Sequence, residues 1–159
     1  MNTTDYGASM REHSWRYFEL HAGQRITVFN YFLFASGATA AGLAATLQGT
    51  ARFSSLGIAL GVLLMLVSFI FWKLDQRVSF LIKHAEQALA ETEQAFSAKE
   101  ACLFLFEPKV TTESSDAANW WSRQWTYGRA FRFVFVVMGL FGVCGAGLSA
   151  AKFAGWLVW

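Results

Sequence analysis

The sequence predicts an all-α membrane protein with three transmembrane helices, the second of which continues into a long cytoplasmic helix. Three apolar stretches of membrane-spanning length lead to this prediction, at residues 26–47, 53–72 and 133–151. None of them contains Asp, Glu, Lys, Arg or His. The composition agrees, because 55% hydrophobic and 17% aromatic residues are more than an average soluble domain carries.

Four segments follow from the positions of these stretches. Residues 1–25 are expected to form an N-terminal amphipathic cytoplasmic helix, which a capping box from Ser9 to Glu12 would start. Residues 26–72 form a transmembrane hairpin around a short loop at 47–54. Residues 73–130 form a cytoplasmic helical region, whose linker at 107–119 is polar and contains Pro108. Residues 131–159 form the third transmembrane helix and an external tail.

The distribution of basic residues predicts the orientation. Eleven Lys and Arg residues lie in the N-terminal and middle segments, and only Arg52 and Lys152 lie on the other side of the membrane helices. By the positive-inside rule, the N-terminus is cytoplasmic and the C-terminus external. The same cytoplasmic segments hold all eleven acidic residues, so their bulk charge does not predict a polyanionic partner.

No glycine, proline or turn cluster interrupts the chain after Trp72, so the second helix is expected to run on into water. A four-three spacing of small and apolar residues continues along it, which is typical of a coiled coil or a bundle and needs a partner helix. We therefore expect a homo-oligomeric bundle. The predicted seam consists of Leu74, Val78, Leu81, Ala85, Ala88, Thr92, Ala95 and Cys102.

Small and hydroxyl residues within the apolar stretches suggest either pore lining or close helix packing. Hydroxyls at spacings of three, seven and four lie on one face of the first helix, and they either bond their own helix or face water and neighbours. Glycines in the second and third helices permit close approach. The candidates are Asn30, Ser36, Thr39, Gly57, Gly61, Gly139, Gly142 and Gly145.

Polar and charged residues also flank the membrane ends on the cytoplasmic side. Topology alone brings these ends to one membrane face, where they would form a collar. The collar either makes ordinary interfacial ion pairs or gates a pore, which would need several copies around an axis because three helices enclose no useful channel. Its candidates are His21, Gln24, Arg25, Asp75, Arg77 and His84.

Two further patterns concern nucleic acids. Arg77 and His84 have the loose spacing of HEPN-type ribonucleases, although Val78 stands where that family usually has a polar residue. Aromatic and basic residues alternate just before the third membrane helix, as in a membrane-interface belt or a surface for single-stranded nucleic acid. That second pattern comprises Trp120, Trp121, Arg123, Trp125, Arg129 and Arg132.

Apart from the spacing of Arg77 and His84, the sequence carries no signature of a catalytic centre, metal site or cofactor site. It has no phosphate-binding loop, no nucleophile elbow and no histidine pair at metal-ligand spacing. Cys102 would be cytoplasmic and Cys144 lies within the third membrane helix, so both are expected to be packing residues rather than a disulfide.

The chain resembles small membrane effectors of bacterial anti-phage defence. The resemblance covers roughly the first 90 residues, and its motifs are YFELHAGQR at 17–25, FNYF at 29–32 and KLDQR at 73–77. Two relatives share this layout: the membrane accessory protein of type VI CRISPR systems, and the membrane channel component of the Hailong system, which DNA made by its nucleotidyltransferase partner controls.

The resemblance implies a ring-like homo-oligomeric pore or ion channel that depolarises the inner membrane during abortive infection. Its partners would be the lipid bilayer, further copies of the chain, and single-stranded nucleic acid or a cytoplasmic defence protein. Arg77 and His84 would then be gating or structural residues. The alternatives are a membrane-tethered HEPN-like ribonuclease that uses Arg77 and His84, and a membrane scaffold for a defence partner.

Overall fold

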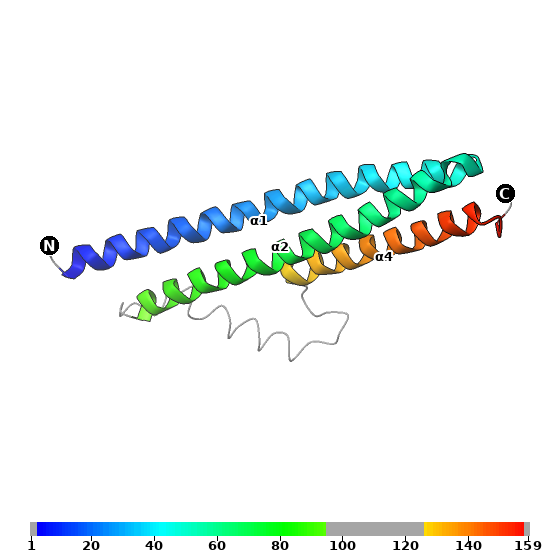
Figure 1. The fold of residues 1–159 in the computed structure, drawn as a ribbon. Coiled ribbons are helices and arrows are strands. Elements are labelled where there is room, and N and C mark those ends of the chain that lie inside the picture. Colours follow the sequence, from blue (N-terminus) through cyan, green and yellow to red (C-terminus); the bar gives the residue numbers. More distant parts are fainter. Residues whose placement is uncertain (1–2, 95–125, 158–159) are drawn as a thin grey trace. The chain divides into compact units, whose positions relative to one another are not determined.

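The computed structural model describes residues 3–94 and 126–157, and all of its regular structure there is helical (Figure 1). The elements are the helix α1 (Thr3–Gln48), the single 3-10 turn η1 (Ala51–Phe53), the helix α2 (Ser54–Gln94) and the helix α4 (Tyr127–Phe153). The all-helical fold class is therefore confirmed for the described part of the chain.

All three helices are long and apolar enough to cross a membrane. The candidate spans are Ser9–Gln48, Ala51–Glu91 and Tyr127–Phe153. A helix suits these sequences because it satisfies every backbone polar group within the segment, as an apolar environment requires. With 46 and 41 residues, α1 and α2 would be about 70 Å and 60 Å long, roughly twice the hydrocarbon core of a bilayer.

The expected hairpin loop lies where the sequence places it. α1 ends at Gln48 and α2 begins at Ser54, with η1 between them. The Gly49 amide donates to Ala45 O at 3.1 Å, which extends the hydrogen bonding of the last turn of α1. The predicted capping box is wrong, however, because α1 begins at Thr3 and Ser9 lies inside the helix.

α4 ends in a glycine-based cap. Gly155 has a φ of 77°, which glycine adopts without the steric cost of a side chain. The Gly155 amide donates to Lys152 O and the Trp156 amide to Ala151 O, at 3.2 Å and 3.0 Å. This pair of bonds is a Schellman motif, and it satisfies carbonyls that the helix end would otherwise expose.

The chain divides into two compact units. Unit 1 contains Met1–Arg25 and Arg77–Thr126, and unit 2 contains Ile26–Gln76 and Tyr127–Trp159. α1 and α2 each contribute to both units, whereas α4 belongs to unit 2. The linker at 107–119, the cysteine at 102 and the tryptophans at 120, 121 and 125 lie outside the described residues.

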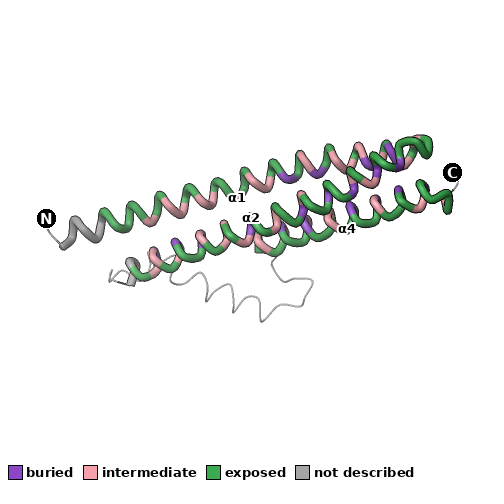
Figure 2. Tube along the Cα trace, in the orientation of Figure 1, coloured by how far each residue is buried: buried purple, intermediate pink, exposed green. Residues whose placement is uncertain are grey.

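The buried face of α2 differs from the predicted seam. In Figure 2, buried positions recur along α2, and within unit 1 they are Ile82, Ala85 and Leu89. Only Ala85 belongs to the predicted set, whereas Leu74, in unit 2, is 43% exposed. At the other two positions the buried residue comes one later than the predicted one, with Ile82 in place of Leu81 and Leu89 in place of Ala88. Leu89 offers more apolar area than Ala88 does. Cys144 is also a correction, because it is exposed on α4 rather than packed.

Candidate functional site

An aromatic cluster joins the three helices of unit 2. Phe32 of α1 is fully buried and lies against Phe71 of α2 and Phe135 of α4, with ring centroids 5.4 Å and 4.7 Å away. Phe29 stacks on Phe131 with a centroid separation of 3.9 Å and an interplanar angle of 11°. These contacts fix the depth at which α1, α2 and α4 meet.

An acidic side chain is also buried in unit 2. Asp75 of α2 is only 4% exposed, and its Oδ2 lies 3.8 Å from Nε of Arg132 on α4, whose side chain is 48% exposed. The expected collar residue Asp75 thus forms an ion pair between two helices with Arg132, a candidate for nucleic-acid contact. A buried carboxylate in a span that could cross a membrane is costly, and such residues are usually functional or structural anchors.

Small residues allow α2 and α4 to pack backbone against backbone. A Cβ atom at Gly61 would lie 2.7 Å from the Gly142 O and Ala146 N atoms, and one at Gly142 would lie 2.7 Å from Gly61 O. Such approaches leave no room for a side chain. A Cβ at Gly57 would also meet Ser149, and one at Gly145 would meet Leu43 of α1.

The hydroxyls of α1 bond to their own helix. Ser36 donates to Leu33 O, Thr39 to Ala35 O and Thr46 to Leu43 O, at 3.3, 2.7 and 2.7 Å. Ser36 and Thr46 are buried, at 1% and 8% exposure. These side chains therefore fit the packing alternative within one subunit.

The other pore-lining candidates occupy different surroundings. Asn30 is exposed on α1. A Cβ at Gly139 would lie 3.6 Å from the Ser68 Cβ, which is an ordinary contact. Asn30 and the α4 surface at Gly139 could thus contact lipid, water or another copy of the chain.

A buried lysine holds the end of α1, which the sequence did not predict. Lys152 of α4 is 6% exposed, and its ammonium donates to Leu47 O at 2.7 Å and to Gly49 O at 2.8 Å. The last carbonyls of a helix have no partner within it, and a cation is favourable at that negative end. A lone lysine after an apolar stretch usually reaches out to the membrane surface, so the sequence signal was ambiguous.

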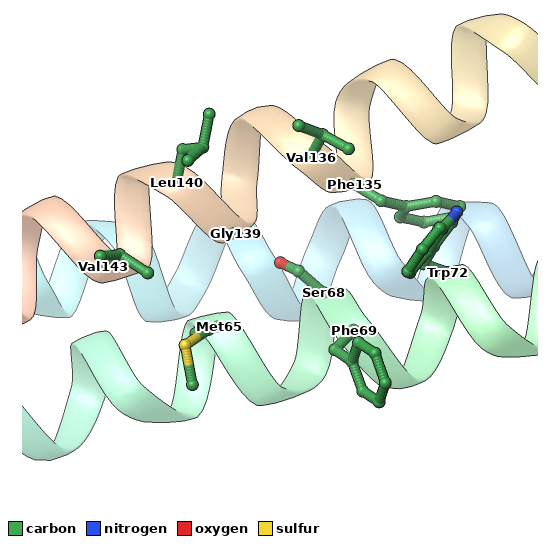
Figure 3. A pocket seen from close by; sticks show the side chains of 9 residues that line it. All are labelled: Met65, Ser68, Phe69, Trp72, Phe135, Val136, Gly139, Leu140 and Val143. Carbon is green, nitrogen blue, oxygen red and sulfur yellow. The ribbon is translucent and has the colours of Figure 1, made fainter.

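An apolar groove runs between α2 and α4 on the surface of unit 2 (Figure 3). α2 contributes Met65, Phe69 and Trp72, and α4 contributes Phe135, Gly139 and Val143. Ser68 lies at its floor, where its hydroxyl donates to Leu64 O at 2.8 Å. The groove has a volume of about 220 Å³. Trp72 and Phe135 lie together at one end of it, and Met65 and Val143 at the other.

The other five collar candidates belong to unit 1, whereas Asp75 belongs to unit 2. His21 Nδ1 lies 2.8 Å from Tyr17 O, and the two rings lie 4.1 Å apart. Gln24 is exposed and Arg25 is half-buried. The structure therefore shows local contacts within one helix for His21, and a collar that includes both units stays a prediction.

Arg77 and His84 lie on α2 within unit 1, and both are exposed. The His84 ring stacks on Phe80, with centroids 6.3 Å apart and an interplanar angle of 12°. The residues described in 3–94 and 126–157 contain no group of three or more His, Cys, Asp or Glu side chains that could hold a metal ion.

Of the proposed nucleic-acid segment, the structure describes only the end. Arg129 and Arg132 lie in the first turns of α4 and are exposed, while Trp120, Trp121, Arg123 and Trp125 are outside the described residues. Nucleic-acid contact by this segment stays a prediction.

The chain was compared with known proteins. No family model matches it, and no solved structure matches it. It is similar to CD-NTase-associated protein 19 of Escherichia coli, with 45% identity over 133 residues that cover 83% of this chain and 85% of the relative. An identity of this size over most of both chains shows common ancestry. The chain therefore belongs to the family of CD-NTase-associated protein 19.

Proposed function

We propose that this protein is a homo-oligomeric membrane effector of bacterial anti-phage defence, which forms or gates a pore in the inner membrane. The family assignment supports the defence role, and three apolar helices support membrane association. The proposal assigns the N-terminus and the long middle segment to the cytoplasm, in agreement with the excess of Lys and Arg there. It assigns no catalytic step to the chain.

The apolar surface of unit 2 is the observation that carries the proposal. In the most apolar windows of the three spans, 17%, 28% and 22% of the residues are buried. Most of the apolar surface of these spans must therefore be covered by lipid or by another copy of the chain. Inside unit 2, Phe32, Leu43 and Leu64 are fully buried and fill the space between the helices. A conducting path would therefore run between copies.

The relative's name associates it with a CD-NTase, and we extend this association to the present chain. A partner enzyme or its nucleotide product would then supply the signal in the cytoplasm, received by unit 1. This agrees with the resemblance to the Hailong channel more closely than with the type VI CRISPR accessory protein, because the former acts with a nucleotidyltransferase.

Conductance measurements test the pore directly. The purified full-length chain in liposomes should release a small dye or carry current when the lysate of infected cells that express the neighbouring defence genes is added. The same liposomes with lysate from uninfected cells are the control. If every oligomeric form stays impermeable with the activating lysate, the pore proposal is wrong and a scaffold becomes the better account.

The ribonuclease alternative makes a different prediction. A double substitution, Arg77→Ala with His84→Ala, should leave dye release unchanged if the two residues only support the helix. Loss of RNA cleavage in the same double variant, with dye release intact, would favour a membrane-tethered ribonuclease. Both residues are exposed, so this substitution should not disturb the fold.

A further inference from the structure

The groove between α2 and α4 continues at one end into basic residues. Its last lining residues there are Trp72 and Phe135 (Figure 3). The ammonium of Lys73 lies 5.2 Å from the Trp72 ring centroid and 5.8 Å from that of Phe69, so this cation touches the wall of the groove. Lys73 is exposed.

α4 supplies further cations on the same face. Leu140 and Val136 line the groove, and Arg132 and Arg129 precede Val136 in the chain by four and seven residues. Residues at such spacing lie on one helix face. Arg129 and Arg132 are exposed, and Arg132 also pairs with Asp75. The apolar groove thus has three cations at one end, two of them outside the ion pair.

We propose that this groove is a binding site for an anionic phospholipid. One acyl chain lies along the apolar wall, and the phosphate meets Lys73 and Arg129. The groove extends over about 10 Å of α2, from Met65 to Trp72, against about 15 Å for the acyl region of one leaflet. A cavity of about 150 Å³ already holds a benzene ring, so 220 Å³ accepts several methylene groups.

Charge complementarity selects this occupant over a second copy of the chain. A basic pocket between membrane helices on the cytoplasmic side is favourable for an anionic headgroup, and the tryptophan suits the interface region. The apolar stretches of another copy, at residues 26–47, 53–72 and 133–151, contain no Asp or Glu and would bring no negative charge to Lys73 and Arg129. The inference shares with the proposed function only the placement of α2 and α4 in a membrane, and it does not depend on a pore.

Native mass spectrometry of the full-length chain in neutral detergent tests the site. The wild type should bind phosphatidylglycerol more tightly than zwitterionic phosphatidylcholine. A cation near a lipid phosphate is worth about a fivefold change in affinity. The double variant Lys73→Gln with Arg129→Gln should therefore bind phosphatidylglycerol roughly 25-fold more weakly. Arg52→Gln, at an exposed cation beyond the other end of the helices, should bind as the wild type does.

A second pair of variants tests the apolar wall. Gly139→Leu should fill the groove and weaken the binding of both lipids, because a side chain starting there meets only Ser68 at an ordinary distance. Gly147→Leu is the matched control on the same helix, since a Cβ there meets nothing within 4 Å. Thermal unfolding of both variants checks that they are folded.

Wild-type binding by either the double variant or Gly139→Leu would overturn the lipid site. The lipid site would also be overturned if Gly139→Leu changed the mass of the oligomer and left lipid binding intact. The groove would then be covered by another copy of the chain. Pore activity is a separate result: conductance in liposomes without a phosphatidylglycerol preference would leave the proposed function standing and remove this inference.

Discussion

Two charged side chains are buried in unit 2, and their partners differ in kind. Asp75 faces the guanidinium of Arg132, so two opposite charges compensate each other. Lys152 instead donates to two carbonyl oxygens at the end of α1. Both arrangements tie α4 to the hairpin of α1 and α2, one at each end of α4, because Arg132 lies near its start and Lys152 near its last residue. These two charged contacts fix the register of α4 against α1 and α2.

Lys152→Met should destabilise the protein more than Arg52→Met does. The first substitution keeps the apolar length of the side chain but leaves the half-buried Leu47 and Gly49 carbonyls without their donor, which costs about 1 kcal/mol, the low end of the range for buried groups. Arg52 is exposed, and its loss should change stability by less than about 0.5 kcal/mol. Thermal unfolding in detergent, followed by circular dichroism, measures both. Equal midpoints would show that the cap is not stabilising.

Asp75 and Arg132 should tolerate substitution unequally. Arg132→Gln removes the cation that faces a buried carboxylate, whereas Asp75→Asn leaves a half-exposed arginine that water or lipid headgroups can solvate. We expect the first to cost about 2–4 kcal/mol, below the usual range for fully buried pairs, and the second clearly less. A double-mutant cycle on the unfolding free energy should give a coupling above about 0.5 kcal/mol. Additive effects would mean that the pair does not interact.

At the scale of elements, α2 and α4 meet through glycines and serines rather than through interlocking large side chains. The Gly61 and Gly142 contacts are backbone contacts, which a neighbouring side chain cannot relieve by rotating. Such close packing suits helices in an apolar solvent, where burying apolar surface gives little driving force and contact density gives more. The larger side chains are left to face outward, as at Phe69 and Leu140.

Gly61→Ala should separate α2 from α4, although it improves helix propensity. Its Cβ would lie 2.7 Å from backbone atoms of α4, and overpacking of this kind costs about 1–3 kcal/mol. Gly147→Ala is the control, because it adds the same methyl group in open space and should stabilise by up to about 1 kcal/mol. Chemical unfolding in mixed micelles would measure the difference. A Gly61→Ala variant as stable as Gly147→Ala would contradict the close contact.

The sequence predicted the helices and their hairpin well, because long uncharged stretches and a glycine-containing loop are local signals. For the glycines and hydroxyls the sequence offered packing as one of two alternatives, and the contacts of Gly61, Gly142, Ser36 and Thr46 within unit 2 fit that alternative. Within one chain the buried row of α2 differs from the predicted seam at Leu74, because which of two adjacent rows is covered depends on the helix that packs there. A seam between copies stays a prediction. Lys152 was missed for a similar reason: its acceptors lie about 100 positions away in the chain, and no spacing within α4 indicates them.

For the whole molecule, α2 is one continuous helix that contributes residues to both units. One helix, Ser54–Gln94, supplies the glycine face and Asp75 to unit 2 and the buried row at Ile82, Ala85 and Leu89 to unit 1. A continuous helix transmits rotation and displacement along its axis, whereas a flexible joint does not. If unit 1 receives the signal, α2 is the element through which unit 2 would respond.

An insertion at the boundary of the units tests this role. Three glycines after Gln76 should leave the chain in the membrane, because the contacts within unit 2 lie before the insertion or in α4. Cross-linking shows whether the oligomer persists. Activation should fail, since glycine destabilises a helix interior by about 1 kcal/mol per residue and breaks the mechanical connection. Depolarisation of infected cells, read with a potential-sensitive dye, and chemical cross-linking of the oligomer report the two properties separately.

The informative control for this experiment keeps the helix and lengthens it. An insertion of seven alanine-rich residues at the same position adds about two turns, so the faces of α2 before and after it stay nearly in phase. This variant should retain more activity than the glycine variant if coupling depends on helix continuity. If both insertions abolish depolarisation equally, the distance between the units matters rather than stiffness. If the glycine variant is as active as the wild type, α2 does not carry the signal, and unit 1 acts on the membrane segment through α1 or the start of α4.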